Sequence, residues 1–439
     1  MHLQKRRRKP TSFRTISRLG AFSLVAASAL LGFQVSSANA ADLSGSCCAD
    51  LEERIAELEA TTARKGNRRM SLTVSGQVHQ IALYFSDGFR RDIAFVDNTN
   101  TSTRFRFTGT GKVSDDVSIG YMIELEGDTG RSFDVDQLRS VRPSTLNIRK
   151  SEVWADSKRL GRLWFGLGSP ATDDIILLAT DGANAAVLSD TPLIGGGLFL
   201  RQTDGTLLNG ALQNNTRVRE FAPGLDTRRF DRFRYDSPTW LGGKLVASFG
   251  ERSEWDVAVW WDGKLGDFTA RAAIGYYNDN LPSTGLLTAG EGFQEVKGSS
   301  SIIHDPTGLF FTQAFVHRMF DGNRLSGGNL PDLNHYYART GIVGSWFPIG
   351  KTTLYGEFAN SEDGLTGRAE AGFAEVTSSR AQVFGIGILQ NIPAAATDLY
   401  LSYRHWELDA SGVDALGGAR RNGSFEDVDL IYAGALVRF

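Results

Sequence analysis

From residue 70 to the end of the chain, apolar and polar side chains alternate with a period of two. In TRFRFTGTGK, Phe105 and Phe107 fall on one face and Arg104 and Arg106 on the other, and the next segment, VSIGYMIELE, alternates in the same way. A strand of this kind suits a sheet with one face in an apolar setting and the other in water. A β-sandwich shows the same alternation locally, so the deciding feature is its persistence along the chain.

The alternation recurs in about sixteen segments, each near the length of a tilted membrane strand. The candidate strands span residues 70–85, 101–112, 117–126, 145–157, 162–168, 229–237, 244–250, 255–263, 267–277, 291–304, 309–319, 334–346, 352–359, 379–391, 397–408 and 425–439. Short connections such as 158–161, 264–266 and 305–308 alternate with long ones. This layout predicts an all-β fold: a sixteen-stranded antiparallel transmembrane β-barrel over residues 70–439. Its last strand would close on the first, with Phe439 in an interfacial aromatic girdle.

The first forty residues differ from the rest. Seven Lys and Arg residues precede the apolar run 19–33, and Ala38-Asn39-Ala40 offers a small-x-small cleavage site. We interpret 1–40 as a signal peptide; a membrane anchor would need a run of roughly 20 residues, and a lipid site at Cys47 lacks the usual apolar residue before it. Without this segment, 40 Lys and Arg oppose 50 Asp and Glu, a net charge of −10. We therefore expect a cell-envelope protein, located in the outer membrane, that has no nucleic-acid partner.

Residues 41–69 form a separate unit in which Cys48, Leu51, Ile55 and Leu58 recur at spacings of three and four. This heptad-like pattern predicts a short periplasmic coiled-coil helix and linker, with a solvated amphipathic tether as the open alternative. Cys47 and Cys48 are the only cysteines of the chain, and in an oxidising compartment they are candidates for disulfides between neighbouring copies. Two free thiols are the alternative, which a non-reducing gel showing only monomer would favour.

Several motifs resemble the alphaproteobacterial porin family of general trimeric outer-membrane porins. IRKSEVWADSKRLGRLWFGLGSPAT is similar to the strands before the constriction loop of such porins, and RFRYDSPTW to the strand after it. HDPTGLF, WFPIGKTTLYGEF, DLYLSYRHWEL and the N-terminal CCADLEERIAELE add to the resemblance. The resemblance covers residues 41–439 and implies a sixteen-stranded, homotrimeric, water-filled pore that an inward-folded third loop narrows.

The residues themselves also point to a constriction, because the connection 169–228 is far longer than a structural turn needs. Its first part is acidic, whereas its last part and the next strand are rich in Arg. Opposed rows of charge across a water-filled neck would orient polar solutes. Ordinary cross-strand pairing is the alternative, since the expected register sets Arg106 against Glu124 and Arg104 against Glu126. The candidate constriction residues are Arg104, Arg106, Asp173, Asp174, Asp181, Asp190, Arg228, Arg232 and Arg234. Arg149 is a further candidate whose direction the alternation leaves open.

The sequence therefore predicts a porin for passive diffusion of small hydrophilic solutes and ions, with outer-membrane lipid and lipopolysaccharide around it. An outer-membrane barrel enzyme, such as a lipid hydrolase or protease, would need a nucleophile and a base placed together. His79, His304, His317, His335 and His405 lie in different segments without such a motif. We expect no enzymatic activity, no cofactor and no metal site. A substrate-selective channel stays open, as does ion preference: the net charge favours cations but the neck is rich in Arg.

Overall fold

The computed structural model describes residues 69–139, 144–208, 216–280, 292–414 and 420–439. The predicted signal peptide and coiled-coil helix, with Cys47, Cys48, Leu51, Ile55 and Leu58, lie outside the described residues. No helix in the described ranges is long and apolar enough to cross a membrane.

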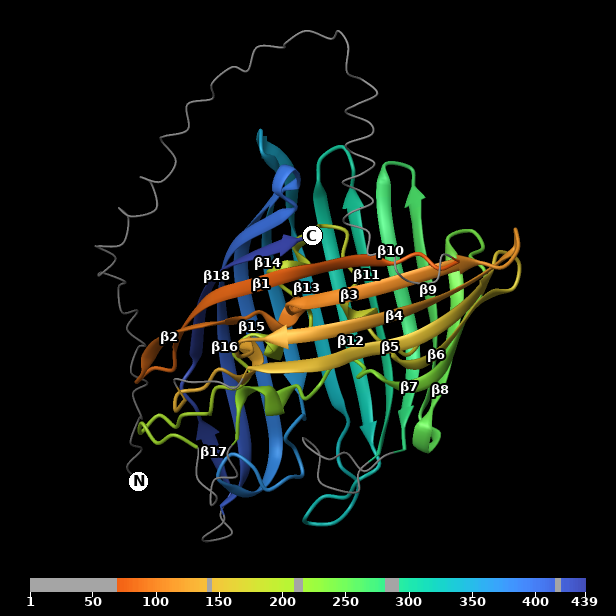
Figure 1. The fold of residues 1–439 in the computed structure, drawn as a ribbon. Coiled ribbons are helices and arrows are strands. Elements are labelled where there is room, and N and C mark those ends of the chain that lie inside the picture. The colour runs from red at the N-terminus through yellow and green to blue at the C-terminus, as the bar shows by residue number, and fades with distance from the viewer. Residues whose placement is uncertain (1–68, 140–143, 209–215, 281–291, 415–419) are drawn as a thin grey trace, which may run out of the picture. The chain divides into compact units, whose positions relative to one another are not determined.

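Antiparallel strands form the framework of the described chain (Figure 1). They are β1 (Thr73–Ser86), β2 (Arg91–Asp97), β3 (Arg104–Lys112), β4 (Val117–Asp128), β5 (Thr145–Ser157), β6 (Gly161–Gly168), β7 (Phe230–Asp236), β8 (Gly243–Gly250), β9 (Trp255–Leu265), β10 (Phe268–Asp279), β11 (Phe293–His304), β12 (Leu309–Phe320), β13 (Leu333–Phe347), β14 (Gly350–Glu362), β15 (Phe373–Ile392), β16 (Thr397–Asp414), β17 (Arg420–Ser424) and β18 (Val428–Arg438). Short 3-10 helices interrupt the connections: η1 (Thr99–Thr101), η2 (Ser132–Asp134), η3 (Ile175–Leu177), η4 (Ala183–Ala185), η5 (Thr191–Leu193), η7 (Val218–Phe221), η8 (Glu251–Ser253) and η9 (Pro393–Ala395).

These eighteen segments occupy sixteen places around one closed barrel. β2 and β3 both pair with β1, and β17 and β18 both pair with β16, so each of these two pairs of segments acts as one interrupted strand. Every other strand pairs with its neighbour in the chain. The predicted sixteen-stranded barrel is confirmed. β2 and β17 were not predicted; β17, RRNGS, has no apolar face that would mark it as a strand.

Pairing of the last strand with the first closes the barrel. The register runs from Gln77 opposite Arg438 to Ser86 opposite Asp429. Beyond β18, the backbone of Phe439 exchanges hydrogen bonds of 2.9 and 3.1 Å with Gly76. The Phe439 ring lies 5.8 Å from that of Phe105, and both rings are exposed on the outer surface. A Cβ at Gly76 would lie 2.5 Å from the Phe439 ring, so a side chain there would displace the terminal residue.

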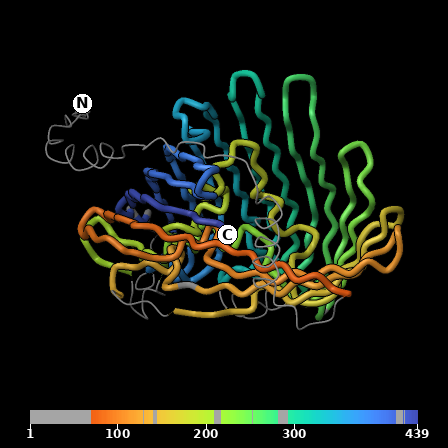
Figure 2. Tube along the Cα trace, turned by 45° about the horizontal axis from the view of Figure 1, so that its top comes forward, coloured from red at the N-terminus to blue at the C-terminus, as the bar shows by residue number. Residues whose placement is uncertain are grey.

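The alternation of the sequence sorts side chains between lipid and lumen. On β16, Leu399 and Leu401 are exposed, whereas Tyr400, Ser402 and Arg404 point inward and are buried. The buried inward side chains are covered by the connection between β6 and β7, which runs inside the ring of strands as the yellow-green tube of Figure 2. The lumen is therefore narrowed from within by the chain itself.

Candidate functional site

The connection 169–229, which we name the inner loop, joins β6 to β7 and contains η3, η4, η5 and η7. Its apolar side chains, including Ile176, Val187 and Ile194, share one buried cluster with inward residues of the barrel wall such as Leu430. A Cβ at Gly195 would lie 2.6 Å from Leu430, which shows how closely loop and wall approach. Burial against the apolar inward residues of the wall stabilises this apolar stretch inside the barrel.

Charged side chains of the wall hold the inner loop by ion pairs and by hydrogen bonds that they donate to its carbonyl groups. Arg339 of β13 lies 2.9 Å from the Asp181 carboxylate and donates to the Val187 carbonyl at 2.8 Å. Both side chains of this ion pair are fully buried. Losing one partner would leave the other buried and uncompensated, which costs about 3–5 kcal/mol. The Arg339–Asp181 pair is thus an anchor of the loop.

Two further arginines repeat the arrangement. Arg318 of β12 donates to the carbonyl groups of Pro223 and Gly224, at 2.6 Å each, and pairs with Glu295 of β11. Arg404 of β16 donates to the Thr191 carbonyl at 2.7 Å. These bonds satisfy loop carbonyls that cannot reach bulk water. The inner loop is therefore held against one side of the lumen, from β11 to β16.

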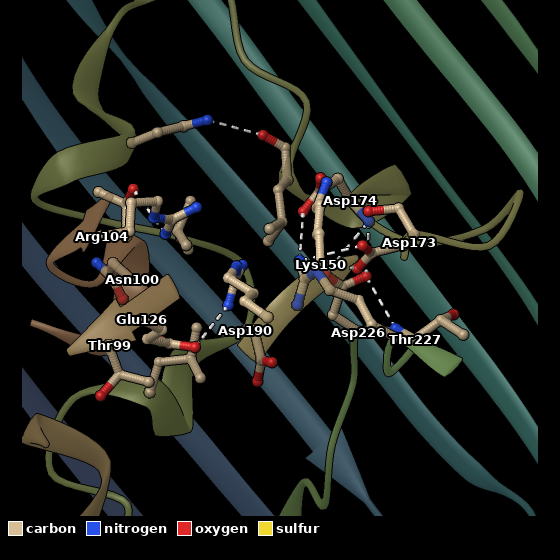
Figure 3. A pocket seen from close by; sticks show the side chains of 18 of the residues that line it. Thr99, Asn100, Arg104, Glu126, Lys150, Asp173, Asp174, Asp190, Asp226 and Thr227 are labelled. Atoms are coloured by element: carbon tan, nitrogen blue, oxygen red, sulfur yellow. Dashed lines mark hydrogen bonds and ion pairs between the residues drawn. The ribbon is translucent and has the colours of Figure 1, made fainter. Parts of the chain in front are cut away.

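A cavity of about 990 Å³ remains between the inner loop and the opposite side of the barrel, and charged groups dominate its lining. Figure 3 shows Arg104 and Glu126 on one side of this cavity and Asp173, Asp174 and Asp226 on the other. The basic side chains come mostly from the wall, whereas the carboxylates of Asp173, Asp174, Asp190 and Asp226 come from the loop. We name this space the neck.

On the wall, three arginines surround one buried carboxylate. Glu124 of β4 lies 3.7 Å from Arg104 and 2.9 Å from Arg149, and it also pairs with Arg106. The predicted register, Arg106 opposite Glu124 and Arg104 opposite Glu126, is confirmed. Glu124 is fully buried while Arg106 is 39% exposed, so a solute in the neck meets guanidinium groups before it meets their counter-charge.

On the loop, the carboxylate oxygens of Asp173, Asp174 and Asp226 lie within 4.8 Å of one another. Oxygens in such a group could coordinate a divalent cation. Here Arg229 supplies positive charge, 3.0 Å from Asp173 and 3.9 Å from Asp174. The cluster is thus already compensated in part by a protein cation.

Burial and neighbouring charges shift the pKa of these loop carboxyl groups. Burial raises the pKa of Asp190 to about 6. The charge of Asp173 raises the pKa of Asp174, and burial together with Asp173 raises that of Asp226. Although burial opposes ionisation of Asp173, Arg229 holds the pKa of Asp173 below its usual value. Acidification therefore neutralises Asp190, Asp174 and Asp226 before Asp173.

Most candidates from the sequence line the neck: Arg104, Arg106, Asp173, Asp174, Asp190, Arg228, Arg232 and Arg234. Asp181 does not; it points into the wall and binds Arg339. Arg149, whose direction the alternation left open, lines the neck too, and so do Lys150, Asp226 and Arg229, which were not among the candidates. Asp226 lies in a part of the loop without periodicity, where the sequence carries no signal for direction. Arg229 begins the predicted strand 229–237 and has the parity of the outward Phe233, but β7 begins only at Phe230, so Arg229 belongs to the loop.

A family model for Gram-negative porins matches residues 25–411. The chain belongs to the Gram-negative porin family. It is an outer-membrane β-barrel channel. Among curated proteins, none matches the sequence.

Several solved structures share the fold at low sequence identity. The anion-selective porin from Comamonas acidovorans is 14% identical with a TM-score of 0.55, over 84% of this chain and 100% of that one. OprB of Pseudomonas putida is 9% identical with a TM-score of 0.53, over 89% and 97% of the two chains. The trimer form of OmpT of Vibrio cholerae is 11% identical with a TM-score of 0.50, over 84% and 99%.

Replacing Arg339 with Ala tests the anchoring of the inner loop. Loss of the buried pair with Asp181 is expected to destabilise the loop by about 3–5 kcal/mol and to raise the open-channel current noise. The matched control is Arg380→Ala, because the pair of Arg380 with Asp409 is exposed and contributes about 0–1 kcal/mol. Single-channel recording and the thermal midpoint of the folded barrel report the effect. Equal noise and equal midpoints in the two variants would contradict it.

Protonation of Asp190 predicts a pH dependence of ion selectivity. Because its pKa is about 6, lowering the pH from about 7.5 to about 5 removes negative charge from the neck and raises the permeability of chloride relative to potassium. In Asp190→Asn, the permeability ratio of chloride to potassium at the higher pH is expected to exceed that of the wild type. Acidification should change this ratio less in the variant than in the wild type. Reversal potentials in a KCl gradient measure both. A ratio that falls on acidification would contradict the assignment.

Proposed function

We propose that this chain forms an open, water-filled pore through which small hydrophilic solutes and ions diffuse passively. The neck supports this proposal, because it is a cavity of about 990 Å³ lined by charged side chains inside a closed barrel. Because polar and charged residues make up most of the lining, ions and polar solutes keep polar partners there, which favours them over apolar solutes. Passage then depends on size and charge and needs no turnover.

A barrel enzyme is the alternative function, and the surroundings of the histidines bear on it. His405 lies 2.8 Å from Asp429, but in the described part of the chain neither of its ring nitrogens contacts a serine, threonine or cysteine side chain. His79 is buried between Tyr400 and the Thr101 carbonyl. His335 contacts Ser361, but both side chains are buried, so a substrate has no access to this pair. These contacts favour structural roles. A channel that selects one nutrient remains the second candidate, because the neck offers many polar groups.

We further propose that three copies assemble in the outer membrane, surrounded by lipid and lipopolysaccharide. The outer face of the barrel exposes apolar side chains that need lipid or another copy as cover; on β1 to β5 they include Val74, Val78, Ile93, Phe95, Phe105 and Leu146. The similar OmpT structure in its trimer form supports the number three.

The segment before the barrel fits this assembly. We propose that residues 1–40 are removed as a signal peptide and that residues 41–69 form a periplasmic helix and linker, whose heptad spacing would bring three copies together. Membership of the alphaproteobacterial branch is part of the same proposal, on the motifs of the sequence.

Single-channel recording of the refolded chain in a planar bilayer tests the proposed function. We expect a steady conductance that closes in three equal steps, one for each copy. A folded barrel without conductance would contradict the open pore. Conductance that closes in single, independent steps would retain the pore but contradict the trimer.

A further inference from the structure

Strand β5 contains a β-bulge at the neck. Glu124 of β4 pairs with Lys150 and its neighbour Leu125 pairs with Ile148, so Arg149 is an extra residue in β5. Adjacent residues of a regular strand face opposite sides, but a bulge resets the alternation. As a result, Arg149 and Lys150 both line the neck.

The four cations at this point, Arg104, Arg106, Arg149 and Lys150, form what we name the basic cluster. Its counter-charges are the buried Glu124 and the half-buried Glu126, the latter 3.2 Å from Arg149. Four positive charges thus face two negative ones. In the described structure, no carboxylate lies within ion-pair distance of the Lys150 ammonium, although Asp173 and Arg229 lie nearby. The surplus positive charge is therefore directed at the lumen.

The lining of the neck as a whole repeats this imbalance. Twelve Lys and Arg residues line the cavity against six Asp and Glu residues. Three carboxylates outside the lining are far less exposed than the arginines they pair with: Glu124, Glu254 and Asp398. Charges at a constriction weigh more than charges on outer loops. The local field thus opposes the cation preference that the net charge of −10 after signal removal would suggest.

We propose that the basic cluster binds small oxyanions, such as phosphate or a carboxylate, and gives the channel a preference for anions. Guanidinium groups form paired, charge-assisted hydrogen bonds with such oxygens, and the ammonium of Lys150 adds a point charge beside them. This inference rests on the proposed function of an open pore and names its solute class.

Reversal potentials across a tenfold KCl gradient test the preference, with the refolded chain in a planar bilayer. The wild type should pass chloride more readily than potassium. Lys150→Gln should lower the permeability ratio of chloride to potassium by about two- to fivefold, the effect of one unit charge at close range in water. Lys158→Gln is the matched control, because Lys158 is exposed at a short turn outside the neck, and it should leave the ratio unchanged. Arg106→Gln serves as a second variant if Lys150→Gln does not fold.

Addition of sodium phosphate or sodium succinate at constant ionic strength tests the binding site. Each oxyanion that binds should reduce the chloride current in a saturable way, and less so in Lys150→Gln; block by one of the two salts identifies the preferred oxyanion. A conducting channel that prefers potassium, or that neither salt blocks, would overturn this inference and leave the pore intact. A folded chain without conductance would overturn the proposed function itself.

Discussion

The architecture depends on one constraint: backbone hydrogen-bonding groups inside a membrane must all be paired, because hydrocarbon offers them no partner. Closure by β1 and β18 meets this constraint, since it leaves no open sheet edge. It also fixes the sorting of side chains, because a slip of one residue would turn every lipid-facing side chain into the lumen. The pairing of Phe439 with Gly76 extends this closure to the last residue of the chain.

A closed barrel of sixteen strands encloses more space than its own inward side chains can fill. The inner loop takes up part of this space, and its apolar residues make the inward faces of β12 to β18 an ordinary protein core. The buried charges at Arg318, Arg339 and Arg404 then serve the loop carbonyls and Asp181 rather than passing solutes. The opposite wall, left uncovered, keeps its charges for the neck. The barrel thus divides its inward charges between holding the loop and lining the passage.

The sequence determined the parts of the fold that follow a period. Strand number, the Arg104 to Glu126 register and the inward direction of Arg232 and Arg234 all follow from alternation, which lipid on one side and water on the other enforce. The errors lie where the period is broken. The bulge at Arg149 is an insertion of one residue that no residue type signals. Because of it, the alternation did not identify Lys150 as a residue of the neck. Asp181 and Asp173 both lie in the acidic first part of the loop, and the sequence does not distinguish their directions. Asp181 points into the wall because it pairs with Arg339, which is 158 positions away in the chain.

The inner loop lies inside the lumen against the wall, where Thr180 of the loop and Ser301 of β11 have their hydroxyl oxygens 2.8 Å apart. A disulfide between these two positions would demonstrate this placement. In a chain with Cys47 and Cys48 replaced by Ser, the double variant Thr180→Cys, Ser301→Cys should form a disulfide under mild oxidation, because the side chains are within bonding reach. The folded barrel should keep its conductance. Free thiols in both positions of a folded, oxidised barrel would show that the inner loop does not lie against β11.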